Sequence, residues 1–108
     1  MPLEGIMQGA IDRKRAIKLA GVTKAISDPV RMRIISLLAQ ADRRGMRVFE
    51  MQTAIGLSQP TTSHHLKLLK EAGMVKRQRV GRAVTYRLDA GALAALFKTI
   101  TAAATKNK

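Results

Sequence analysis

The chain contains no cysteine among its 108 residues. This absence excludes disulfides, thiolate metal sites and cysteine nucleophiles. Aromatic side chains are also scarce, since Phe49, Tyr86 and Phe97 are the only ones. The hydrophobic core must therefore consist mainly of Leu, Ile, Val, Ala and Met, and a chain of this length supports a single domain with one modest core.

Acidic residues are the other scarce class. Seven Asp and Glu stand against twenty Lys and Arg, which gives a formal net charge of +13. Such an excess is not needed for solubility and repels itself in the folded state, so it indicates a polyanionic partner, of which double-stranded DNA is the one we expect. A basic surface without a partner, or one that meets an anionic membrane, is the alternative.

Segments typical of membrane or secreted proteins are missing from the sequence. It has no long apolar run that could span a bilayer, and its first ten residues lack the basic start and apolar run of a signal peptide. We therefore expect no membrane partner and a cytoplasmic location. Nothing resembles a catalytic pattern either, because carboxylates are scattered and no glycine-rich phosphate loop is present, so we expect neither an enzyme nor a cofactor.

Helical periodicity begins after a short lead-in. Residues 1–11 carry Pro2, Gly5 and Gly9 and are expected to be flexible, whereas residues 12–104 should form one domain, followed by a polar tail at 105–108. The first helix is expected between Asp12 and Ser27. Its apolar stripe is Ala16, Leu19, Ala20, Thr23 and Ile26.

A second helix is predicted from Asp28-Pro29, because Asp is a strong N-cap and Pro fits the first helical turn. Residues 47–49 could pair briefly as a strand, and a short helix should follow at about 50–55. The Gly56-Leu57-Ser58 tripeptide then supplies a left-handed C-cap, a core residue and an N-cap for a further helix at about 59–72. Two helices joined by such a turn form a helix-turn-helix.

From residue 74 to residue 88 the hydrophobic period changes to two, which predicts a β-hairpin with its tip at 80–82. A last helix is expected after Asp89. The predicted fold is therefore mainly α with a small β-hairpin wing, a winged helix-turn-helix with an extra helix at each end.

The helix at about 59–72 has two distinct faces at 100° per residue. Thr62, Leu66 and Leu69 fall on the side that should meet the core, and His65 lies at its flank, where a structural hydrogen bond is favoured over a base contact. The opposite face is polar and can reach base edges in a major groove, while the hairpin can clamp phosphates or place Arg82 in a minor groove. The candidate DNA-binding residues are Gln59, Thr61, Ser63, His64, Lys67, Arg77, Arg79 and Arg82. A solvated polar face without a partner is the alternative, and Arg31 and Arg33 could meet either phosphates or ordinary surface partners.

Apolar stripes on the first and last helices predict a homodimer, because a small domain should not leave both stripes in water. The candidate interface residues are Leu19, Leu93, Leu96, Phe97 and Ile100.

Four fragments in this order resemble the ArsR/SmtB family of bacterial repressors. They are residues 28–34, 56–67, 71–75 and 80–88, and the resemblance covers roughly residues 22–88. It implies a winged-helix dimer, paired through its first and last helices, that sits on an inverted repeat in an operator.

The chain departs from that family at the residues that bind metal. Arg47 and Phe49 occupy positions where metal-sensing members place thiolates, and Ala90 and Ala92 lie where others place carboxylate and imidazole ligands. We therefore expect no metal site and no response to zinc, cadmium or arsenite. A harder ion gathered across a dimer by Asp12, Glu50 and Asp89 stays open, as does release by an organic ligand or a partner protein.

These observations predict a sequence-specific transcriptional regulator, most simply a repressor. The alternative is a winged-helix module that coats nucleic acid without reading its sequence, or that binds another protein.

Overall fold

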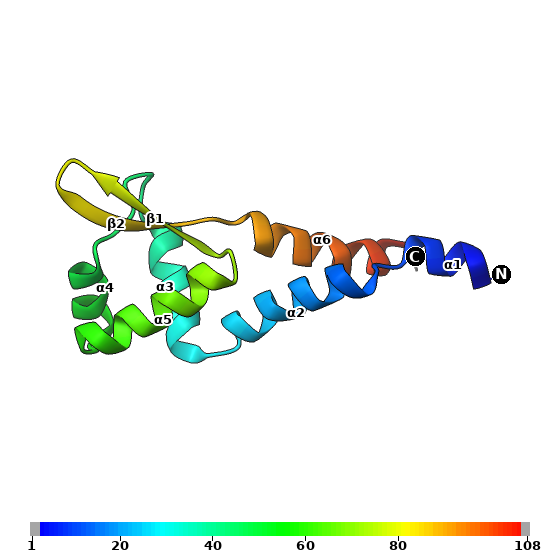
Figure 1. Cartoon of the computed structure of the whole chain (residues 1–108), viewed down its shortest axis with the longest axis horizontal. Helices are drawn as coiled ribbons and strands as arrows, with labels where there is room; N and C mark the ends of the chain where they lie inside the picture. Colours follow the sequence, from blue (N-terminus) through cyan, green and yellow to red (C-terminus); the bar gives the residue numbers. More distant parts are fainter. Residues whose placement is uncertain (1–2, 107–108) are drawn as a thin grey trace.

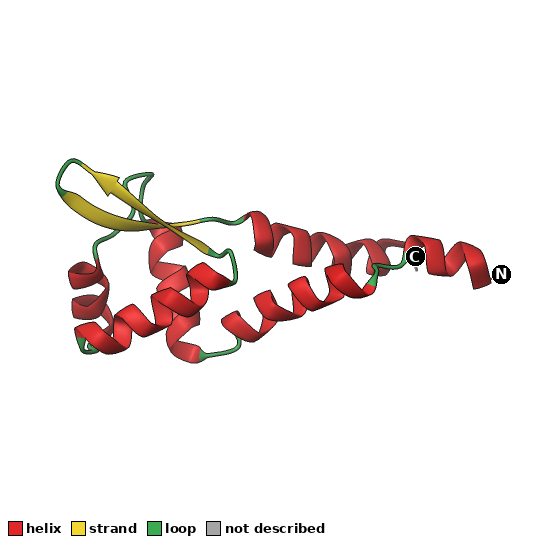
Figure 2. Cartoon of the chain, viewed as in Figure 1, coloured by secondary structure: helices red, strands yellow, loops and turns green. Residues whose placement is uncertain are grey.

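The computed structural model describes residues 3–106, which form helices and one β-hairpin (Figures 1 and 2). The elements are α1 (Leu3–Gly9), α2 (Arg13–Ile26), α3 (Pro29–Gln40), α4 (Val48–Ile55), α5 (Gln59–Glu71), β1 (Val75–Val80), β2 (Ala83–Leu88) and α6 (Gly91–Lys106). The predicted order of helices around a helix-turn-helix and a wing is confirmed.

The molecule is elongated, with extents of 57 × 25 × 24 Å. The helices α2 and α6 run side by side and form one arm, beyond which α1 projects (Figure 1). The other end holds α3, α4, α5 and the two strands. The helix-turn-helix and the wing therefore share one end of the molecule.

Capping residues set where the helices begin. The carboxylate of Asp12 accepts a hydrogen bond from the backbone N–H of Arg15 (2.8 Å), and that of Asp28 accepts one from Arg31 (3.0 Å). Ser58 caps α5 through Thr61, and Gly56 ends α4 at φ = 83°, a left-handed conformation that glycine adopts without a steric penalty. The turn predicted from Gly56-Leu57-Ser58 is the one that separates α4 from α5, but Leu57, expected in the core, is only half-buried and is not part of the core cluster.

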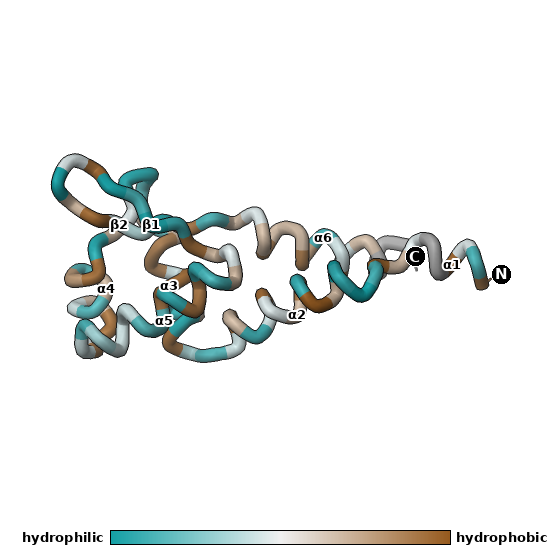
Figure 3. Tube along the Cα trace, in the orientation of Figure 1, coloured by the Kyte–Doolittle hydropathy of each residue, from teal (hydrophilic) through white to brown (hydrophobic). Residues whose placement is uncertain are grey.

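One core joins the elements at the winged end and the adjoining half of α2. Hydrophobic residues recur along α2, α3 and α5, as Figure 3 shows. The buried cluster comprises Val22, Ala25, Ile34, Leu38, Met51, Leu66, Leu69, Met74 and Val75. The predicted stripe on α2 was displaced, because Leu19, Val22 and Ala25 are buried whereas Ala20 and Thr23 are exposed.

The wing is held at its base by the loop between α3 and α4. The two strands pair antiparallel from Val75 opposite Leu88 to Val80 opposite Ala83. Met46 and Tyr86 exchange two backbone hydrogen bonds of 2.8 Å, so this loop adds a single bridge to β2. Gly45 permits the approach, because its φ is +73° and a Cβ atom there would overlap the carbonyl oxygen of Tyr86.

Three details differ from the sequence-based prediction. The strand expected at 47–49 does not form, because Val48 begins α4 and only Met46 pairs with β2. Residues Leu3–Gly9 form a short helix within the stretch expected to be a flexible lead-in, and α6 runs to Lys106, into the expected tail. The rest of that tail, residues 107–108, lies outside the described residues. None of the helices in the described range 3–106 has the length and apolar character needed to cross a membrane.

Candidate nucleic-acid interface

The outward face of α5 carries the polar side chains predicted to meet DNA. Gln59, Thr61, His64 and Lys67 are exposed, and Ser63 is half-buried. On the opposite face Thr62, Leu66 and Leu69 are fully buried. The helix is therefore fixed by one face and presents the other to solvent, as its periodicity predicted.

Hydrogen bonds within α5 already engage part of this face. The amide of Gln59 donates to the hydroxyl of Ser63 (3.2 Å), and the hydroxyl of Ser58 donates to that of Thr61 (2.9 Å). Within residues 3–106, His64 and Lys67 have no hydrogen bond or ion pair. These two side chains can meet a ligand without first breaking an intramolecular bond.

A polar contact between α5 and α3 supports α5 from the side opposite its outward face. The guanidinium of Arg31 donates to Nδ1 of His65 (3.3 Å) and, through Nε, to the carbonyl oxygen of Ala25. Because arginine has no acceptor, Nδ1 must be unprotonated in this bond. Nδ1 also lies 3.9 Å from the carboxylate of Asp28, whose pKa is lowered, first by the backbone hydrogen bond from Arg31 and then by the positive charge of Arg31. The structural role expected for His65 is confirmed, and Arg31 is engaged within the chain.

Replacing Arg31 with Met should lower the free energy of unfolding by about 1–3 kcal/mol, because the partly buried acceptors on Ala25 and His65 lose their donor. Arg33→Met is the matched control, since Arg33 is exposed on the same helix and should change stability by less than about 0.5 kcal/mol. Urea unfolding followed by circular dichroism measures both. Equal stability of the two variants would mean that the Arg31 contact does not support α5.

The wing presents its cations to solvent. Arg77, Arg79 and Arg82 are exposed, and Arg82 lies in the turn between the strands. Within the described residues none of the three forms an ion pair, whereas Lys76 lies 3.5 Å from Asp89. The amide of Gln78 donates to the carbonyl oxygens of Arg43 (3.1 Å) and Arg44 (3.2 Å), which fixes the wing to the loop that precedes α4. This anchoring role was not foreseen, because Gln78 lies in a run of basic residues with no pattern that marks a long-range contact.

The predicted dimer residues divide into three groups by their exposure. Phe97 and Ile100 remain 54% and 57% exposed, while Leu93 and Leu96 are half-buried against the core. Leu19 is only 6% exposed within one chain, so it has little surface to offer a partner. Ile17 on α2 is also exposed and was not among the residues predicted from periodicity.

The carboxylates considered for a hard ion serve other purposes within the chain. Asp12 caps α2, Glu50 accepts a hydrogen bond from the backbone of Arg47, and Asp89 accepts one from Gly91. The backbone N–H of Gly91, followed by the charge of Lys76, lowers the pKa of Asp89. Among the described residues no group of three or more His, Asp or Glu could hold a metal ion.

Together the fold and this site define a winged helix-turn-helix DNA-binding protein. Residues 28–77 match the family model described as bacterial regulatory protein, arsR family. The biofilm growth-associated repressor of Xylella fastidiosa is 33% identical over 87 residues, covering 81% of this chain and 74% of that protein. The transcriptional repressor SdpR of Bacillus subtilis is 38% identical over 68 residues, covering 63% of this chain and 72% of that protein. The chain belongs to the ArsR family of bacterial regulatory proteins.

Solved structures agree with this assignment. An ArsR-like transcriptional regulator from Rhodococcus sp. RHA1 has a TM-score of 0.75 at 27% identity, covering 84% of this chain and 83% of that one. A homodimeric winged helix-turn-helix DNA-binding domain from Mycobacterium bovis has a TM-score of 0.67 at 34% identity. The match covers 92% of this chain and 91% of that one. The expectation of a DNA-binding regulator rather than an enzyme is confirmed by this membership.

Proposed function

We propose that the protein is a transcriptional repressor that binds an inverted-repeat operator as a homodimer. The observation that carries the proposal is the placement, at one end of the chain, of an outward polar helix face and a basic wing. The repressors from Xylella and Bacillus named above support the direction of regulation.

In this proposal α5 enters the major groove and reads the bases. His64 is exposed, and Gln59 lies in the first turn, where side chains of a recognition helix reach base edges. Gln pairs with adenine through two hydrogen bonds, so its present bond to Ser63 would be exchanged for base contacts. Lys67 and the hydroxyls of Thr61 and Ser63 complete the contacting surface.

The wing acts mainly on the phosphate backbone. Arg77 and Arg79 project from β1, and Arg82 lies in the turn, where it can also follow the width of a minor groove. Phosphate contacts fix the position of the protein on DNA and do not themselves read sequence.

A second copy of the chain supplies the other half of the binding surface. Phe97 and Ile100 on α6 and Ile17 on α2 leave apolar surface exposed on the arm opposite the wing. Pairing through this arm buries those side chains and presents two α5 helices to the two halves of the operator. The homodimeric domain from Mycobacterium bovis supports this assembly.

A salt titration of variants separates base reading from phosphate binding. Gln59→Ala and His64→Ala should weaken operator binding by about 1–3 kcal/mol, because a well-made base contact contributes this much binding free energy. The effect on binding to a scrambled duplex should be much smaller. Arg79→Ala should weaken binding to both duplexes and flatten the slope of log affinity against log salt by roughly one unit. Fluorescence anisotropy on an operator selected from bound genomic fragments gives all these affinities.

Arg13→Ala serves as the charge-matched control, because Arg13 is exposed on α2, away from the wing. It should leave the salt slope unchanged. If the Gln59 and His64 variants lose affinity equally for the operator and for the scrambled duplex, α5 does not read sequence. The alternative of a non-specific nucleic-acid-binding module is then the better account.

A further inference from the structure

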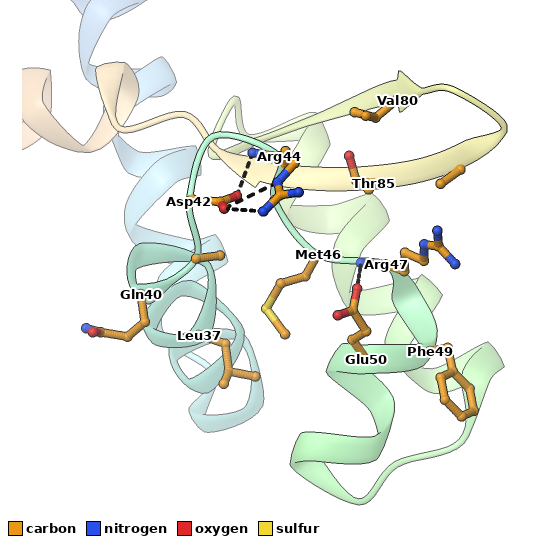
Figure 4. Close-up of a pocket in the computed structure, with 13 residues that line it drawn as sticks. Leu37, Gln40, Asp42, Arg44, Met46, Arg47, Phe49, Glu50, Val80 and Thr85 are labelled. Carbon is orange, nitrogen blue, oxygen red and sulfur yellow. Dashed lines mark hydrogen bonds and ion pairs between the residues drawn. The ribbon is translucent and has the colours of Figure 1, made fainter.

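A groove lies between the wing and the start of α4. Its volume is about 1000 Å³, and its walls come from the end of α3, the loop that follows, the first turn of α4 and the two strands (Figure 4). Its apolar lining consists of Leu37, Ala41, Met46, Phe49, Val80 and Ala83. The polar part of its lining includes Arg44, Arg47 and the carboxylates of Asp42 and Glu50, and a groove of this size has room for a small organic molecule.

Two large hydrophobic side chains at this groove are left uncovered by the chain itself. Phe49 on α4 is 71% exposed, and Val80 at the end of β1 is 42% exposed. A single exposed apolar residue needs no explanation, but two that line the same concavity from different elements indicate a surface that an apolar ligand covers.

One cation of the groove is likewise available. Arg44 is paired with Asp42 (3.1 Å), and the carboxylate of Glu50 accepts the backbone N–H of Arg47 (2.8 Å). The guanidinium of Arg47 makes no hydrogen bond or ion pair within residues 3–106. Guanidinium groups bind carboxylates through two parallel hydrogen bonds, so Arg47 favours an acid.

We propose that this groove binds an apolar organic acid as an effector. Its carboxylate meets Arg47, and its body covers Phe49 and Val80. The bound acid touches both α4, which leads through a short turn into α5, and the wing that carries Arg79. It thereby changes the placement of the two DNA-contacting elements relative to each other and lowers operator affinity. The second step rests on the proposed function, whereas binding of the acid does not.

Nuclear magnetic resonance of the whole ¹⁵N-labelled chain tests binding without DNA. Decanoate and 1-naphthoate serve as probes, and decanol and naphthalene are their uncharged controls. At least one acid should shift the amide resonances of Met46, Arg47, Val80 and Thr85 and saturate below about 1 mM, a modest affinity. Shifts confined to α2 and α6, or no saturable shift with either acid, would overturn the proposal.

Variants then test the site. Arg47→Gln should weaken binding of the acid about tenfold and leave binding of the neutral analogue unchanged. Arg33→Gln, which removes the same charge outside the groove, should change the binding of neither molecule. Ala83→Leu should block both probes by filling the groove, with its fold checked by the remaining amide resonances. An acid that binds equally well to Arg47→Gln would contradict the role of Arg47.

Operator binding in the presence of the acid separates the two hypotheses. The acid should lower the operator affinity of the wild-type protein at least fivefold, and it should leave the operator affinity of Ala83→Leu unchanged. If the acid binds and operator affinity stays constant, the groove is not an effector site, although the proposed repressor function still stands. If the protein shows no preference for any operator while the acid binds the groove, the proposed function fails instead.

Discussion

Replacing Phe97 with Asp should convert the proposed dimer into monomers at micromolar concentration and weaken operator binding at least a hundredfold. The side chain is exposed in the single chain, on the arm where the partner is proposed to pack. A carboxylate buried there without a partner costs several kcal/mol of association free energy, on the order of 3–5 kcal/mol. A monomer also loses the second half-site, which in a dimer binds at high effective concentration.

Sedimentation velocity measures the assembly, and fluorescence anisotropy measures operator binding. Phe49→Asp is the matched control, because Phe49 is the other exposed phenylalanine and lies on α4, remote from the arm. It should remain dimeric. A wild-type protein that sediments as a monomer at micromolar concentration would refute the dimer.

Gly45→Ala should destabilise the fold by about 3 kcal/mol or more, because two unfavourable terms act at this position. The left-handed backbone costs roughly 1 kcal/mol for a residue with a side chain, and the new Cβ must also displace the backbone of Tyr86. The displacement breaks the bridge between Met46 and β2.

Gly81→Ala isolates the first of these terms. Gly81 has a φ of +63° in the wing turn, and a Cβ there would meet nothing within 4 Å. In this control the free energy of unfolding, measured in urea, should fall by only about 1 kcal/mol. Similar losses for the two variants would show that the contact between Gly45 and Tyr86 adds nothing to stability.

Local signals in the sequence predicted most of the elements. Asp28-Pro29 and Ser58 mark helix starts that the structure confirms, and Gly56 marks the turn. The buried face of α5 followed from helical periodicity, because a tightly packed helix leaves few choices for its apolar side chains.

Contacts between distant segments were not predictable in this way. The bonds of Gln78 to residues 43 and 44 join positions 34 and 35 apart, and no local pattern marks them. The stripe on α2 was misassigned because alanine is compatible with either face, so periodicity alone did not separate Ala20 from Ala25. The groove beside α4 arises only when three separate segments come together, and Arg47 was seen in the sequence only as the replacement of a thiolate.

The pairing of Met46 with Tyr86 limits how such a domain can vary. Because this bridge and the bonds of Gln78 hold the base of the wing to the loop before α4, the length of that loop is set by the distance that it spans. The hairpin turn at Gly81 has no comparable tether in the part of the chain that the structure describes. Insertions of residue pairs at the turn would lengthen the wing in register, whereas one added residue between Asp42 and Met46 would shift the whole hairpin. Changes in the length of the wing are therefore tolerated at its tip and opposed at its base.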